Sequence, residues 1–248
     1  MSSRDLPPDI FDDVVDQLSD EPDELKVCCF VSKSWVPRAR KHLFANVKFN
    51  ERAWSCIDRW KEVFPDPSTA PAQYTRSLTL FGLVPATAED FLAWTHSFRH
   101  LVELRLYSST LDKDQVPLSK LRGLSPTLRS LFLCITSAPL SEILDLICSF
   151  PHLEDLRFHH VSGKRNDETW ETPSTSPALT GTLELTGYNF SIVRGLLAFP
   201  DGLDFSRISV SLPVRDAQPI AELILRCSDT LKSLSIGYSG AFSFGFCS

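Results

Sequence analysis

A short apolar motif recurs along this chain at nearly constant spacing, and no other feature of the sequence constrains the fold as strongly. In its clearest copy the apolar residues are Leu101, Leu104 and Leu106. The motif occurs seven times, and successive middle positions lie 26, 27, 25, 27, 25 and 26 residues apart. The middle positions are Leu78, Leu104, Leu131, Leu156, Leu183, Ile208 and Leu234. A fixed period of this length predicts one supersecondary unit that stacks on copies of itself.

Each copy of the motif is expected to form one parallel strand. Because side chains alternate in a strand, the middle and last apolar positions share a face, and stacked strands build a continuous apolar layer. The period and the Leu-x-x-Leu-x-Leu core resemble those of leucine-rich repeats. The resemblance implies an α/β fold over residues 75–248: a leucine-rich-repeat solenoid of about seven repeats, with a curved parallel sheet and helices on its convex side. An ordinary β-rich domain with accidental leucine pairs is the alternative.

The segments between the predicted strands differ in character. Apolar residues at helical spacing predict return helices at 87–98, 139–149, 190–198 and 216–228. The segment 163–177 is polar and has no periodicity, so we expect a mobile loop there. The last strand is followed by Phe242, Phe244 and Phe246. These rings either fold back over the terminal apolar face or belong to a longer array.

Residues 1–46 contain no copy of the motif and instead carry apolar residues at helical spacing. Pro8, Pro22 and Pro37 suit the first turns of three short helices, and Ser34 can cap the third. The first half of this region is acidic and the second half basic, so the two halves are expected to attract each other when packed.

Residues 47–74 are expected to link this helical region to the repeats. The sequence Asn46-Val47-Lys48-Phe49 predicts a short strand, and a helix with Trp54 and Trp60 on one side follows it. A proline-rich loop completes the link.

The apolar residues of the first region also match a known motif in order and spacing. They are Leu6-Pro7, Ile10, Val14, Leu18, Leu25, Val31-Ser32 and Trp35. This pattern resembles the F-box, the helical motif that docks onto the small adaptor of SCF ubiquitin ligases, and the whole chain resembles fungal F-box proteins with leucine-rich repeats. The resemblance implies a three-helix F-box domain at 1–46 that binds the SCF adaptor and through it the cullin, and repeats that hold a protein substrate. Ser32 departs from the motif, since many F-boxes have cysteine there.

In that family the motif positions build the box and its adaptor interface. The matching residues here are Leu6, Pro7, Ile10, Val14, Leu18, Val31 and Trp35. The sequence does not separate interface from internal core among them. Exposure of these residues as an apolar patch beside Trp35 favours adaptor binding, whereas coverage by the first repeat favours an interaction scaffold outside any ligase.

The outward positions of the predicted strands form the concave face, and they change along the chain. The first four strands present aromatic residues and arginines, which anchor many protein interfaces. We therefore predict that a protein substrate binds a surface formed by Phe81, Arg105, Tyr107, Phe132, Arg157 and His159. The alternative is structural: Arg157 pairs with Glu184 on the next strand, and Phe132 and Cys134 fill space beneath a neighbouring loop.

No motif in the sequence indicates catalysis. The chain has no Gly-x-Ser-x-Gly elbow, no glycine-rich phosphate loop and no His-Glu-x-x-His helix. His159 and His160 are adjacent, but neighbouring residues of a strand point to opposite faces, so the two rings cannot share a metal ion. We therefore predict no enzymatic activity, no cofactor and no metal site.

The composition favours protein partners. The chain has 31 acidic and 25 basic residues and a formal charge of -6, which gives no basic excess for nucleic acid or anionic lipid. The start of the chain is acidic and proline-rich, unlike a signal peptide, and no apolar run reaches membrane-spanning length. We expect a cytoplasmic or nuclear protein with no nucleic-acid or membrane partner, whose cysteines serve as small buried apolar residues.

Overall fold

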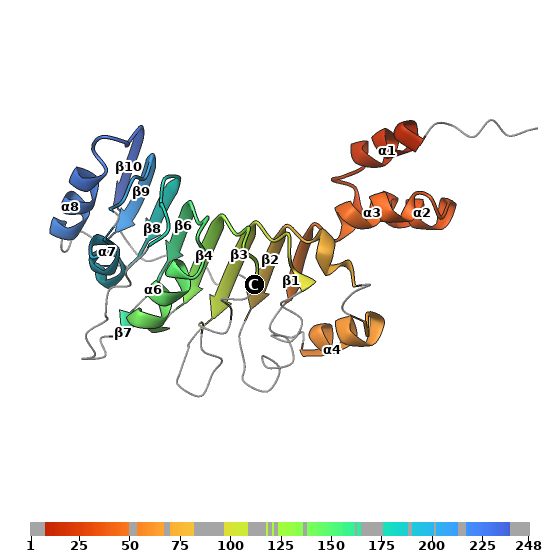
Figure 1. Cartoon of the computed structure of the whole chain (residues 1–248), viewed down its shortest axis with the longest axis horizontal. Helices are drawn as coiled ribbons and strands as arrows, with labels where there is room; N and C mark the ends of the chain where they lie inside the picture. Colours follow the sequence, from red (N-terminus) through yellow and green to blue (C-terminus); the bar gives the residue numbers. More distant parts are fainter. Residues whose placement is uncertain are drawn as a thin grey trace, which may run out of the picture.

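The computed structural model shows a mixed α/β fold built on a parallel sheet of eight strands (Figure 1). Seven α-helices are present in the part of the chain that the structure describes. The described residues are 8–49, 54–66, 70–81, 97–108, 118, 121, 124–135, 138–161, 163–164, 176–187, 190–200, 202–212 and 217–238.

The strands of the large sheet lie side by side in chain order, β1-β2-β3-β4-β6-β8-β9-β10. They are β1 (Asn46–Phe49), β2 (Ser77–Phe81), β3 (Glu103–Ser108), β4 (Ser130–Ile135), β6 (Asp155–His159), β8 (Thr182–Thr186), β9 (Arg207–Leu212) and β10 (Ser233–Tyr238). A second sheet pairs β5 (Ala138–Pro139) with β7 (Gly163–Lys164). The helices are α1 (Pro8–Gln17), α2 (Pro22–Val31), α3 (Val36–Leu43), α4 (Trp54–Val63), α6 (Leu140–Cys148), α7 (Phe190–Leu197) and α8 (Gln218–Arg226), with a 3-10 turn η1 (Pro71–Tyr74).

The register of the sheet aligns the repeated motif from strand to strand. Leu104 lies opposite Leu78 on one side and Leu131 on the other. The same alignment continues through Leu156, Leu183, Ile208 and Leu234. The prediction that the seven copies form neighbouring parallel strands is therefore confirmed.

The strand expected in the linking segment belongs to the large sheet. β1 pairs with β2 so that Val47 lies opposite Leu78 and Phe49 opposite Leu80, and both β1 residues are buried. The sheet therefore has one strand more than the sequence motif predicts. Phe44, Val47 and Phe49 follow the apolar spacing of the motif, but Val47 precedes Leu78 by 31 residues, which lies outside the period of the other copies.

One large apolar core lies between the sheet and its helices. It contains the middle and last apolar residues of the motif in β2, β3, β4, β6, β8 and β9. Ile143 and Leu144 of α6 and Ile192 and Leu196 of α7 pack against them in the same core. Figure 1 shows α6, α7 and α8 on the same side of the sheet. We call the other side the open face, and we call β1 to β10 with α4 and α6 to α8 the sheet unit.

Three of the predicted return helices are present as α6, α7 and α8. The return predicted at 87–98 lies outside the described residues, apart from its last two positions. Residues 163–164, where the predicted mobile loop begins, form β7 and pair with Ala138–Pro139. Residues 165–175 of that loop lie outside the described part of the chain.

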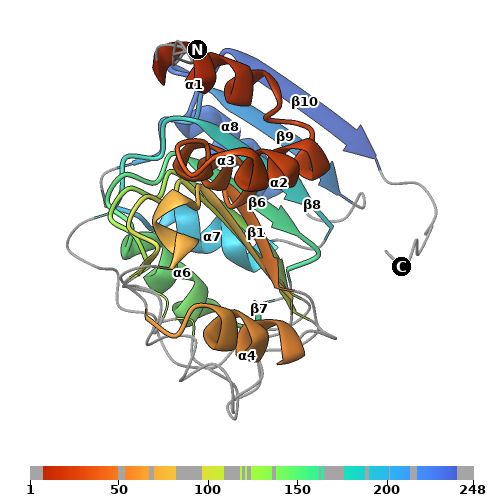
Figure 2. The ribbon, with the colours of Figure 1, turned by 90° about the vertical axis from the view of Figure 1, so that its right-hand side faces the viewer.

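The first three helices have an apolar core of their own, and we call residues 8–43 the helical unit. This core is separate from the large one and consists of Val15, Leu25, Cys28 and Ala39. Figures 1 and 2 place α1, α2 and α3 beyond β1, at the end of the sheet opposite β10. The prediction of three helices in this region is confirmed.

The cap of the third helix differs from the prediction. Trp35, not Ser34, is the residue that precedes α3, and its side chain makes no capping hydrogen bond. The backbone N–H of Ser34 instead donates to Ser32 Oγ at 3.3 Å. Ser32 and Ser34 thus form a serine turn just before the helix. A serine hydroxyl can hydrogen-bond to nearby backbone groups outside a helix as well as at a helix cap.

Candidate interaction surfaces

An ion-pair cluster joins α1 to α3. Arg38 donates from Nε to Asp16 Oδ1 at 2.5 Å and from a terminal nitrogen to Oδ2 of the same carboxylate. His42 Nε2 lies 2.7 Å from Asp16 Oδ1. The hydrogen bonds from Arg38, and then from His42, hold the pKa of Asp16 well below its usual range. The attraction predicted between the acidic and basic halves of this region is therefore present as a direct contact.

Apolar side chains on α1 and α2 are exposed outside the small core of the helical unit. Ile10 and Val14 on α1 are four residues apart, so they lie on one face of that helix. On α2 the exposed side chains are Val27, Phe30 and Val31, and Phe30 is 90% exposed. We call these five side chains the apolar set. Large exposed apolar groups of this kind are typical of surfaces that a partner covers.

The residues that match the F-box motif differ in their exposure to solvent. Ile10, Val14 and Val31 are exposed and belong to the apolar set. Leu18 and Trp35 are partly buried and pack against the core of the helical unit. Leu6 and Pro7 lie outside the described residues.

Two members of the apolar set, Val27 and Phe30, were not among the predicted site residues. A signal for them exists in the sequence, because Val27-Cys28-Cys29-Phe30-Val31 is an unbroken apolar run on a helix. Such a run covers more than one helix face, so some of its side chains must point away from the core. Which ones do so depends on how α2 packs on α3.

The second surface is a row of rings on the open face of the sheet. Phe81 and Tyr107 stack nearly parallel, with their centroids 4.6 Å apart. Tyr107 lies 5.0 Å from Phe132, and Phe132 lies 4.8 Å from the ring of His159. We call these four side chains the aromatic row. The predicted substrate-binding residues of β2, β3, β4 and β6 are therefore brought together in one continuous surface.

Two arginines flank this row and are held by carboxylates. Arg105 and Arg157 lie opposite Phe132 on either side of it. Arg105 contacts Glu103 at 2.9 Å, and Ser77 Oγ donates to the same carboxylate at 2.7 Å. Burial raises the pKa of Glu103, but the bonds from Arg105 and Ser77 outweigh it and leave that pKa below its usual value.

The alternative for this face, in which Arg157 pairs with Glu184 and Phe132 fills space beneath a loop, is only partly observed. Arg157 Nε lies 4.0 Å from Glu184 Oε2, whereas His159 Nε2 lies closer to that carboxylate, 3.1 Å from Oε1. Phe132 is buried as predicted, but the rings of Tyr107 and His159 cover it. The Nε atoms of Arg105 and Arg157 are buried and have no hydrogen-bond partner within the described ranges.

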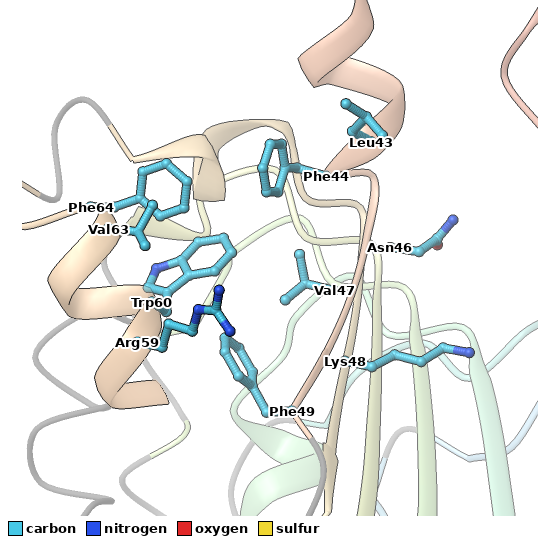
Figure 3. Close-up of a pocket in the computed structure, with 10 residues that line it drawn as sticks. All are labelled: Leu43, Phe44, Asn46, Val47, Lys48, Phe49, Arg59, Trp60, Val63 and Phe64. Atoms are coloured by element: carbon cyan, nitrogen blue, oxygen red, sulfur yellow. The ribbon is translucent and has the colours of Figure 1, made fainter. Parts of the chain in front are cut away.

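A hollow of about 350 Å³ lies where the helical unit meets the sheet unit (Figure 3). Its centre is Trp60 of α4, whose ring lies 5.9, 5.7 and 5.0 Å from the rings of Phe44, Phe49 and Phe64. Its polar lining comes from Asn46, Lys48 and Arg59, with no carboxylate or thiol among the described lining residues. This aromatic cluster covers the β1 end of the sheet.

His159 and His160 are placed as the strand pattern predicts. His159 lies on the open face, whereas His160 follows the end of β6, is exposed and has a positive φ of 52°. Over the described residues, no three His, Cys, Asp or Glu side chains are grouped as a metal site requires. No helix in the described part of the chain is long and apolar enough to cross a membrane. The absence of catalytic activity stays a prediction.

Acid is expected to destabilise the helical unit through Asp16. The pKa of this carboxyl is depressed in the folded chain, so the unfolded chain binds more protons once the pH approaches the ordinary Asp pKa of about 3.9. The stabilisation from Arg38 and His42 is therefore present above that pH and is lost as the pH falls below about 4. Between about pH 5 and about pH 3, the midpoint of thermal unfolding should fall more for the wild type than for Asp16→Asn. Equal falls in the two proteins would show that this contact does not stabilise the fold.

No protein-family model matches this chain, and no curated protein matches it either.

Proposed function

We propose that this protein is the substrate-recognition subunit of an SCF-type ubiquitin ligase. In this proposal the helical unit is an F-box that binds the SCF adaptor and through it the cullin. The sheet unit is a leucine-rich-repeat solenoid, and its open face is the concave surface that binds a target protein. The observation that carries the proposal is the exposed apolar set on α1 and α2, with Phe30 at 90% exposure.

A helical unit of this size gains from a partner on that surface. Its own core contains only Val15, Leu25, Cys28 and Ala39, whereas five larger or comparable side chains remain exposed. Burying one valine, isoleucine or phenylalanine side chain contributes about 1.5–3 kcal/mol. Covering the apolar set with an adaptor would therefore stabilise the complex strongly. The contacts of Asp16 with Arg38 and His42 hold α1 on α3, which keeps the exposed apolar side chains of α1 and α2 in a defined geometry before binding.

The open face supports the target-binding half of the proposal. Aromatic and arginine side chains are the residue types that most often dominate binding energy at protein interfaces. The aromatic row is preassembled by ring contacts, so a target does not have to order these side chains when it binds. Arg105 and Arg157 lie on either side of Phe132, and their partly exposed guanidinium groups can meet the carbonyl or carboxylate groups of a target.

The proposal is tested by binding of the purified chain to the SCF adaptor. The wild type should form a one-to-one complex on size-exclusion chromatography. The double variant Phe30→Ser/Val31→Ser should weaken it by roughly 30- to 1,000-fold, since each side chain is expected to be worth on the order of 1–2 kcal/mol. Leu225→Ser on α8 is the matched control, because Leu225 is similarly exposed, at 72%, and lies on the far helix of the sheet unit.

Three outcomes are distinguishable in this experiment. Loss of the complex in the double variant but not in Leu225→Ser supports an F-box. No complex with a folded wild type contradicts the proposal and leaves an interaction scaffold whose helical unit binds another protein. Equal binding by all three proteins shows that the adaptor does not use the apolar set.

A further inference from the structure

The backbone edge of β1 that faces away from β2 has unused hydrogen-bonding groups. The C=O of Ala45 accepts from the N–H of Ser77, and a strand in a parallel ladder turns alternate residues toward its neighbour. The N–H and C=O groups of Asn46 and Lys48 therefore point away from β2, and no described residue bonds to them. Figure 2 looks onto this end of the sheet, with α3 above β1 and α4 below it. At the other end, residues 239–248, where the predicted phenylalanine cap falls, lie outside the described residues.

The hollow between the helical unit and the sheet unit lies directly beside this edge, because all of β1 lines it. Figure 3 shows the rings of Phe44, Phe49 and Trp60 on one side of β1 and the side chain of Lys48 on the other. Val63 of α4 also lines the hollow and is 58% exposed. Proteins that bind a peptide as an added strand combine these two features: the strand edge supplies backbone hydrogen bonds, and a pocket receives alternate side chains.

The charge around this edge is basic. Lys48 and Arg59 are the charged residues among the described residues that line the hollow. Both are exposed, and neither pairs with a carboxylate of another described residue. The chain has no acidic residue from Leu25 to Asn50, a stretch that includes α3 and β1. Pairing of this edge with a second copy of itself would bring like charges together, whereas an acidic strand would be attracted.

We propose that the free edge of β1 binds an extended acidic peptide segment of another protein, which joins the large sheet as an added strand. Side chains alternate along such a segment, so one large apolar residue enters the hollow while its two neighbours point to the side of Lys48. Those neighbours are acidic, which makes the ligand a segment of alternating acidic and apolar residues. The site uses neither the apolar set nor the aromatic row, so it is independent of the proposed ligase function.

Binding of a short fluorescent peptide to the full-length chain tests the proposal. The probe alternates glutamate with phenylalanine or valine, and a second probe has lysine in place of glutamate. The glutamate probe should bind the wild type saturably and should bind Lys48→Glu/Arg59→Glu about tenfold more weakly or worse. The lysine probe should prefer that variant. Arg207→Glu/Lys232→Glu is the matched control, because both residues are exposed, lie near the far end of the sheet and give the same change in net charge.

Hydrogen exchange followed residue by residue identifies the edge that the probe occupies. In the free protein the outward amides of Asn46 and Lys48 should exchange faster than the amides of Val47 and Phe49, which face β2. Saturation with the glutamate probe should slow the outward pair about tenfold or more and leave the inward pair unchanged. This wild-type measurement stands even if the charge variant fails to fold.

Four results would overturn the proposal. The first is no saturable binding to a folded wild type, and the second is binding that leaves the outward amides unprotected. The third is competition by a single-stranded oligonucleotide as strong as that by unlabelled peptide, which would assign the cations to nucleic acid. The fourth is protection in the free protein that is lost on dilution, which would assign the edge to a second copy. Phe30→Ser/Val31→Ser should bind the probe as the wild type does, so failure of adaptor binding is a separate result.

Discussion

Replacing Phe158 by alanine is expected to lower the free energy of unfolding of the sheet unit by about 3–5 kcal/mol. Phe158 lies on β6 between Leu133 and Leu185 and is fully buried. Because the neighbouring strands fix the spacing of the layer, they cannot close around the volume that the ring leaves. Urea unfolding followed by circular dichroism measures the change.

Phe81→Ala is the matched control for this substitution. Phe81 stands at the open face and is only half buried, so the variant loses its stacking on Tyr107 and little core volume. The expected loss is about 0.5–1.5 kcal/mol. Similar losses in the two variants would contradict the assignment of the core to the helix side of the sheet.

Leu25→Ala is expected to unfold the helical unit while the sheet unit stays folded. Leu25 is one of four fully packed residues in the small core, and its truncation costs about 2–5 kcal/mol. A core of this size has little stability to lose. Hydrogen exchange read by segment should show fast exchange over residues 8–43 and unchanged protection in β3, β4 and β6.

Val27→Ala on the same helix is the control. Its side chain is exposed, so the helical unit should keep its protection, and the change in its free energy of unfolding should stay within about 0.5–1 kcal/mol. If Leu25→Ala also accelerated exchange throughout the sheet, the two cores would form one cooperative unit. If the proposed adaptor complex forms, Leu25→Ala should lose it by unfolding, whereas Phe30→Ser/Val31→Ser should lose it while folded.

The sequence by itself determined the strands and their neighbours. Alternation within a strand has a period of two, and the motif returns every 25 to 27 residues, so the two patterns together specify which side chains are buried and which strands pair. Leu104 and Leu131 lie opposite each other for this reason. The strand at Asn46–Phe49 was predicted, but its pairing with β2 was not, because the distance from Val47 to Leu78 does not follow the period.

The candidate site residues were predicted in part. The sequence placed Phe81, Tyr107, Phe132 and His159 on one face, because alternation from a known buried position determines the other side of a strand. It did not show that Tyr107 and His159 cover Phe132, or that His159 lies closer than Arg157 to Glu184. Those contacts depend on side-chain rotamers across four strands, which local pattern does not encode.

Only the tertiary structure decided which apolar residues of the first helices are free. A short helix with apolar residues on several sides can bury any of them, and packing selects the side. Here α1 and α2 pack so that Val15, Leu25 and Cys28 are enclosed, while Ile10, Val14 and Phe30 face outward. The same holds at the far end of the sheet, where Leu234 and Ile236 repeat the buried pattern of β9 but have no following strand in the described residues to cover them. The sequence pattern specifies which face of a helix or strand a side chain occupies. Whether that side chain is buried depends on whether another element packs against that face.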